Sequence, residues 1–152
     1  MLDLFKNKKN NPAVWQKDFQ DGFSMEQKAA IILSMGFVAN CDGQTNQKEL
    51  DVIVRTANDI GINLEKELIP GGIMNMTAAK GIEYFGKVLS KLQNDQKEWF
   101  LVCLFNLIHS DSNVVAAEVN EVLNLAEDIG ISSEKYKEII EKWDKLYELF
   151  MK

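Results

Sequence analysis

Apolar residues recur at every third or fourth position along most of the chain, which is the period of a helix with one buried face. No segment alternates apolar and polar residues between turn signals, so we predict no β-strand. Helices are predicted over residues 24–40, 46–60, 63–69, 77–92, 96–108 and 115–129, and from Ser132 or Ser133 toward the C-terminus. The predicted fold class is therefore all-α, with six or seven helices.

A stretch of about thirty residues occurs twice, and internal similarity of this kind indicates one structural unit used twice. Each copy has an Asp in a short polar loop, a Glu in the next helix and a closing Asp-Ile-Gly-Ile. These landmarks are Asp42, Glu49 and residues 59–62 in the first copy, and Asp111, Glu118 and residues 128–131 in the second. We predict two pseudo-symmetric helix-loop-helix hairpins, residues 24–62 and 96–131, at the core of a single domain over residues 1–152. Residues 1–20 are predicted to be an N-terminal extension.

The helix ends are marked by residues that satisfy unpaired backbone groups. A capping box places a small polar residue before the first turn and Glu or Gln three residues later. This spacing occurs at Ser24 with Gln27, at Asn46 with Glu49 and at Asp95 with Glu98. Gly61 and Gly130 each follow a predicted helix, where glycine accepts a left-handed conformation without steric cost. After Pro70-Gly71-Gly72, we predict a loop over residues 73–75 and a new helix capped by Thr77.

The composition is that of an ordinary globular protein, with 46% hydrophobic and 26% charged residues. The net charge is −6 and there is no basic stripe, so we expect no binding to duplex nucleic acid. A negative net charge is compatible with binding of a cation or of a basic protein partner. Cys41 and Cys103 do not have the spacing of a disulfide framework, and we recognise no signal peptide or membrane-spanning run. We therefore predict a cytoplasmic protein.

The first nine residues leave two interpretations open. Three apolar residues precede three basic ones: Leu2, Leu4 and Phe5, then Lys6, Lys8 and Lys9. A short amphipathic segment of this kind can contact a membrane surface or a protein partner. The alternative is a chain terminus with one hydrophobic turn that packs on the rest of the protein.

The repeated acidic residues are the candidate functional groups. Glu49 falls on the helical face of Ile53 and Ala57, which should point into the core. A carboxylate on such a face is costly unless it is hydrogen-bonded, paired or bound to a metal. The function of the protein has to account for this placement.

A calcium loop of the EF-hand type is excluded by the residues before the acidic positions. Asp42, Gly43 and Glu49 do have the spacing of the fifth, sixth and twelfth positions of such a loop. The first ligand position, however, holds Val38 in one copy and Leu107 in the other, and neither side chain carries an oxygen.

The first copy, Ala39-Asn40-Cys41-Asp42-Gly43 with Glu49, resembles the motif of the TerB-like family of tellurite-resistance and stress-response proteins. The second copy, Ile108-His109-Ser110-Asp111-Ser112 with Glu118, departs from the motif because Ser112 replaces glycine. The resemblance extends over residues 24–131. It implies an all-helical domain of two packed hairpins without established catalysis. It also implies a divalent cation (calcium, manganese or magnesium) held by Asp42 with Glu49 and by Asp111 with Glu118.

A structural explanation of the same residues stays open. Asp42 and Asp111 can accept hydrogen bonds from their own loop amides, and Glu49 can complete a capping box. Glu118 is not explained in this way, because Val115 stands at the corresponding cap position.

Other chemistry is sparse. His109, the only histidine, cannot build a typical zinc site, although it can act as a lone metal ligand or balance a helix dipole. The sequence nominates no catalytic triad, no phosphate-binding glycine loop and no Cys/His cluster, so we predict no enzyme activity. The leading hypothesis is a non-catalytic, cation-binding module that acts through protein partners in a stress response. The alternative is a purely structural interaction domain without a metal.

Overall fold

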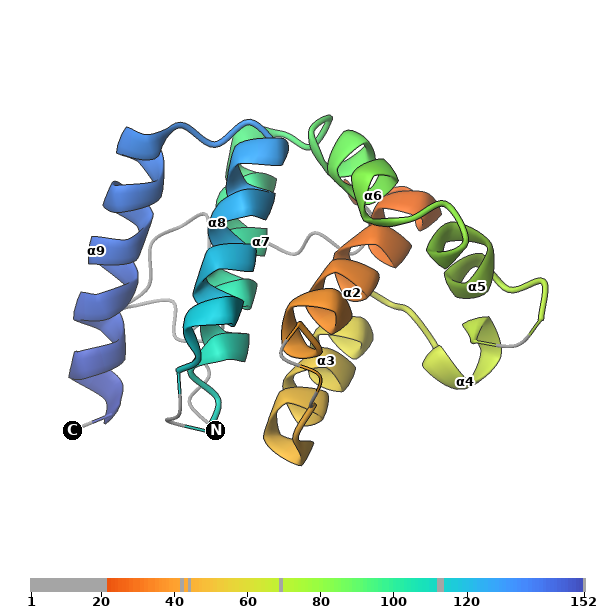
Figure 1. Ribbon diagram of the computed structural model, residues 1–152, viewed down its shortest axis with the longest axis horizontal. Helices are drawn as coiled ribbons and strands as arrows, with labels where there is room; N and C mark the ends of the chain where they lie inside the picture. Colours follow the sequence, from red (N-terminus) through yellow and green to blue (C-terminus); the bar gives the residue numbers. More distant parts are fainter. Residues whose placement is uncertain (1–21, 42, 44, 69, 112–113, 152) are drawn as a thin grey trace.

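The computed structural model describes residues 22–151 except 42, 44, 69 and 112–113, with the backbone alone at 147 and 149–151. Every regular element in this part of the chain is a helix, which confirms the predicted all-α class (Figure 1). The described residues form eight helices, one more than the upper predicted number. They are α2 (Met25–Ala39), α3 (Gln47–Asp59), α4 (Leu64–Glu67), α5 (Ile73–Ala78), α6 (Ile82–Leu89), α7 (Asn94–Ile108), α8 (Ala116–Asp128) and α9 (Ser133–Met151).

Most helix ends follow the predicted local chemistry. The backbone N–H of Gln27 donates to Ser24 Oγ at 3.1 Å, and the N–H of Ser24 donates to Gln27 Oε1 at 2.9 Å. These two bonds complete the capping box at the start of α2. Gly61 and Gly130 have φ of +79° and +90°, which confirms the predicted left-handed conformation after α3 and α8.

The segment after Pro70 differs from the prediction. Residues 73–75 are not a loop but the first half of α5, and α6 begins only after Gly81. Thr77 does not cap a helix, because its side chain is buried within α5 together with that of Met74. Since α5 packs against α2, this burial stabilises a helix of six residues that would be too short to form alone.

The start of α7 also differs from the prediction. The cap is Gln93 instead of Asp95, and the N–H of Gln93 donates to Gln96 Oε1 at 2.9 Å. Glu98 is therefore not a capping residue. Its buried carboxylate lies 3.3 Å from the Nζ of Lys135 and 3.5 Å from the Nζ of Lys142, both on α9.

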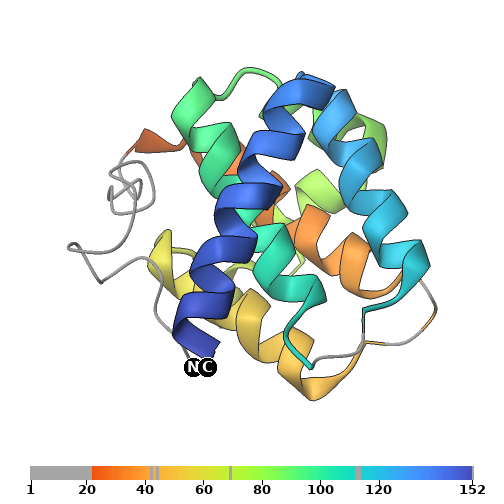
Figure 2. The same cartoon turned by 90° about the vertical axis from the view of Figure 1, so that its left-hand side faces the viewer.

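The two hairpins, α2–α3 and α7–α8, pack crosswise. The helix α3 lies against α7 and α8 lies against α2, so the second helix of each hairpin contacts the first helix of the other. The outer helices then cover this core, with α5 and α6 against α2 and α9 against α7. Figure 2 views α9 from outside, with α7 directly behind it.

The core is almost entirely aliphatic and aromatic, and α7 contributes most to it. The buried apolar residues of α7 are Trp99, Phe100, Leu101, Val102, Cys103, Leu104, Phe105, Leu107 and Ile108. These residues place α7 at the centre of the bundle. No helix within the described residues combines the length and the apolar character that a bilayer crossing requires.

Candidate functional site

The two candidate loops leave their helices by the same turn. The cap residues Asn40 and His109 have φ of −104° and −103°, and both have ψ of 7°. The next N–H bonds to the carbonyl three residues back in each copy, from Cys41 to Val38 at 3.3 Å and from Ser110 to Leu107 at 3.2 Å. The backbone thus repeats where the sequence repeats, even though the side chains differ.

The first loop needs its glycine. Gly43 has φ of +85°, which is costly for any residue with a Cβ, and its N–H donates to the Asn40 carbonyl at 2.9 Å. The predicted ligand Asp42 and the serine that replaces the glycine in the second copy, Ser112, lie outside the described residues.

Glu49 is buried as predicted, with 4% of its surface exposed. It is the third residue of α3, and its N–H donates to Asn46 Oδ1 at 2.9 Å. In return, Glu49 Oε1 accepts the N–H of Asn46 at 3.2 Å. The predicted capping box is therefore present, and it accounts for one of the two carboxylate oxygens of Glu49.

Glu118 occupies the equivalent position in α8 and is equally buried, with 3% of its surface exposed. The residue that begins its helix is Val115, which has no side-chain oxygen, and the start of α8 carries no side-chain cap. A reciprocal capping box therefore cannot account for the burial of Glu118. The core-facing position is kept in both copies, whereas the cap is kept in only one.

Asp111 joins the second loop to the first. The side-chain Nδ2 of Asn46 donates to Asp111 Oδ2 at 2.6 Å, although the two residues are 65 positions apart. A hydrogen bond of this length to a carboxylate is of the strong, charge-assisted kind. The two loops consequently lie side by side, at the lower right of Figure 2. No local sequence signal indicated this contact, because it depends on how the hairpins are packed.

The side chains of these loops offer the oxygen ligands that a hard cation prefers. Glu49, Asp111 and Glu118 offer carboxylate oxygens, which calcium, magnesium and manganese prefer. Among the residues whose placement is described, no three His, Cys, Asp or Glu side chains gather in a metal-binding arrangement. These three carboxylates therefore do not form one common site by themselves.

His109 and the two cysteines are explained by packing. The Nδ1 atom of His109 lies 2.9 Å from the Phe105 carbonyl oxygen, and its ring is centred 4.6 Å from that of Trp143. The histidine is at the C-terminal end of α7, where the sequence placed it. Cys41 is half-buried, and Cys103 is a buried thiol whose pKa is raised by desolvation.

No family model matches the chain, and no curated protein matches it. A crystal structure of PG1108, a protein of unknown function from Porphyromonas gingivalis W83, is similar to it with a TM-score of 0.59. The two sequences are 17% identical, and the match covers 81% of this chain and 97% of the other. Two different sequences therefore adopt this helical arrangement. The TerB-like resemblance stays a prediction.

Proposed function

We propose that the protein is a cytoplasmic, non-catalytic module of the TerB-like kind, which binds a divalent cation at its acidic interhelical loops. In this proposal it acts through protein partners in a stress response. The main support is the repeat itself, because both copies carry an Asp in the loop and a Glu in the next helix, and both glutamates, Glu49 and Glu118, are buried. A buried carboxylate needs a compensating hydrogen bond, cation or metal.

Each loop would hold its cation with the residues that the sequence motif nominates. Glu49 would contribute Oε2, because Oε1 already accepts the N–H of Asn46. Asp42 would be its partner in the first loop, with Asp111 and Glu118 in the second. Two carboxylates are fewer than the six to eight oxygen ligands typical of calcium, so backbone carbonyls and water would complete the shell.

The alternative function is a structural interaction domain in which the acidic residues only hold the loops together. Two observations favour it: the complete capping box of Glu49, and the hydrogen bond that Asp111 accepts from Asn46. Both give a loop carboxylate a role that needs no metal.

Thermal unfolding with added calcium, manganese or magnesium separates the two functions. A cation that binds only the folded protein stabilises it by about 2.7 kcal/mol when its concentration is a hundred times its Kd. We expect Asp42→Asn combined with Asp111→Asn to abolish this shift. The matched control is Glu127→Gln, which removes an exposed carboxylate of α8 and should leave the shift intact. A shift that survives the double substitution would refute cation binding at these loops, and no shift with any of the three ions would favour the structural alternative.

A further inference from the structure

The outer face of α7 is covered by α9 through a small set of specific contacts. Trp143 of α9 donates from Nε1 to Asn106 Oδ1 at 2.9 Å, and its ring also contacts those of Phe105 and His109. At the other end of this surface, the buried Glu98 pairs with two lysines of α9. An amphipathic helix that carries an aromatic residue and lysines therefore fits the outer face of the first helix of the second hairpin.

The same positions in the first hairpin are open. A shift of 69 residues relates Phe105 to Gly36, Asn106 to Phe37 and His109 to Asn40. Phe37 is 40% exposed, and a Cβ added at Gly36 would meet nothing within 4 Å. The helices α5 and α6 pack on α2, but they leave this C-terminal part of its outer face accessible.

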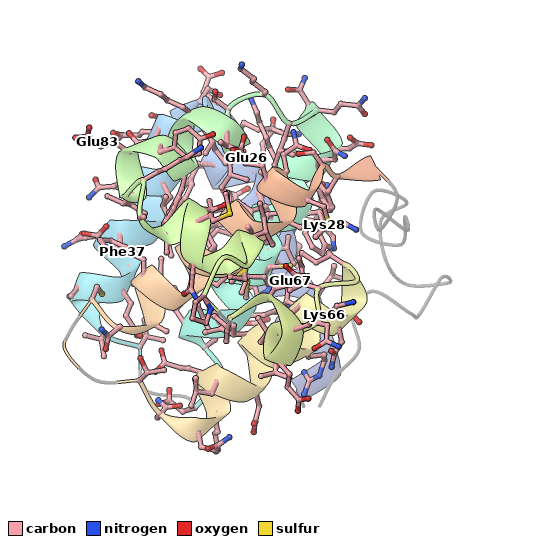
Figure 3. All side chains as sticks on the ribbon, turned by 90° about the vertical axis from the view of Figure 1, so that its right-hand side faces the viewer. Glu26, Lys28, Phe37, Lys66, Glu67 and Glu83 are labelled. Carbon is pink, nitrogen blue, oxygen red and sulfur yellow. The ribbon has the colours of Figure 1, made fainter. Side chains whose placement is uncertain are left out.

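The neighbouring helix α8 extends the open surface. It exposes Val119 and Leu123, which are one helical turn apart, with exposed fractions of 37% and 39%. Phe37 lies at the edge of α2 on the side of α8 in Figure 3, and the two helices are in contact. We define the open face as Leu33, Gly36 and Phe37 of α2 with Val119 and Leu123 of α8.

The charged residues that α8 places beside the open face have one sign. The helix α8 contains no Lys or Arg, and its exposed or partly exposed charged residues are Glu121, Glu127 and Asp128. Residues 29–39 of α2 contain no charged side chain. An apolar surface beside the carboxylates of α8 complements a partner with basic residues and disfavours a second copy of itself.

We propose that the open face binds an amphipathic helix of another protein, which presents an aromatic residue to Phe37 and Lys or Arg to the acidic edge of α8. Such a helix has the chemistry of α9, which occupies the equivalent surface on α7. This inference rests on the partner part of the proposed function and is independent of the cation. Large exposed apolar patches rimmed by polar residues commonly mark interaction sites.

Site-specific photo-crosslinking tests the proposal in the full-length chain expressed in its host cells. The photoreactive residue benzoylphenylalanine replaces Phe37. In the matched control it replaces Val54 of α3, which is 45% exposed but does not belong to the open face. We expect a crosslink to another protein at position 37 only. Mass spectrometry should place it in a helical segment that contains aromatic and basic residues.

The captured segment is then purified, and its affinity for the unmodified chain is measured. Phe37→Ser should weaken binding by about tenfold or more, the effect of removing a central apolar contact, whereas Val54→Ser should bind like the unmodified chain. Equal affinities for the two variants would overturn the proposal. So would the absence of a crosslink at position 37, or a crosslink there to lipid, to a second copy or to residues 1–21 of the same chain. None of these results bears on the cation, which thermal unfolding tests separately.

Discussion

Asn46 connects three parts of the structure, and its replacement by alanine should be unusually costly for a residue on the surface. Its Oδ1 caps α3 through the N–H of Glu49, a contact worth about 1 kcal/mol. Its Nδ2 donates to the carboxylate of Asp111, which contributes about 1 kcal/mol more at a partly exposed position. We therefore expect Asn46→Ala to lower the free energy of unfolding by about 2 kcal/mol.

Two further substitutions separate the two contributions. Asn46→Ser keeps a capping oxygen but is too short to reach Asp111, so it should lose only about 1 kcal/mol. Asn46→Asp also keeps the cap, yet it places a carboxylate against that of Asp111 and should cost more than the serine variant. The expected order of stability is Asn, then Ser, then Asp and Ala.

Urea unfolding at neutral pH measures these differences, and a double-mutant cycle with Asp111→Ala isolates the contact between the loops. The coupling between the two positions should be about 1 kcal/mol, because they are in direct contact. If Asn46→Ser is as stable as the unmodified chain and the cycle shows no coupling, Asn46 does not hold the two loops together.

Three other predictions follow from buried groups. Ser34→Ala should raise the free energy of unfolding in urea by about 1 kcal/mol, because Ser34 Oγ is buried without a hydrogen-bond partner among the described residues. Unchanged or lower stability would contradict this. Glu98→Gln should lower the free energy of unfolding by about 1 kcal/mol, since both lysine partners are nearly half exposed and the pairs are partly screened. High salt should reduce the difference in the free energy of unfolding between the variant and the unmodified chain. A difference that does not change with salt would rule out the ion pairs as its cause. Cys103 should resist a thiol reagent until the protein unfolds, and rapid labelling of two thiols in the native state would refute its burial. Burial raises the pKa of the Cys103 thiol above its ordinary value of 9.0, so just above pH 9.0 only the unfolded chain releases this proton. The free energy of unfolding should therefore fall as the pH rises past 9.0. Cys103→Ser should remove that part of the pH dependence.

The parts of the fold that the sequence predicted correctly depend on interactions within one or two helical turns. The capping boxes at Ser24 and Asn46 join residues three positions apart, and the left-handed Gly61 and Gly130 end helices locally. The burial of Glu49 also follows from helical geometry, because it shares a face with apolar neighbours. These features need no knowledge of how the helices pack.

The parts that were missed depend on packing between distant segments. The helix α5 follows a Pro-Gly-Gly turn, and its N-cap residue Gly72 has no side chain. Its support comes from other elements, through burial against α2 and through Glu67 Oε2, which accepts the N–H of Ile73 at 3.3 Å. Glu98 has the spacing of a cap, yet its lysine partners on α9 are 37 and 44 positions away. The contact between Asn46 and Asp111 likewise appears only after the two hairpins are packed crosswise.

The duplicated loops therefore begin with the same backbone turn but are held by different interactions. The first loop supplies its own cap through Asn46, and the same side chain also binds the aspartate of the second loop. The second loop has Val115 at the cap position, and this side chain has no oxygen that could cap α8. A cation at Asp111 would have to share this carboxylate with Asn46, whereas Glu49 keeps an oxygen that its capping bond does not use. If both loops bind the same ion, the first should bind it more tightly, because the second has to weaken a hydrogen bond that also stabilises the packing of the hairpins.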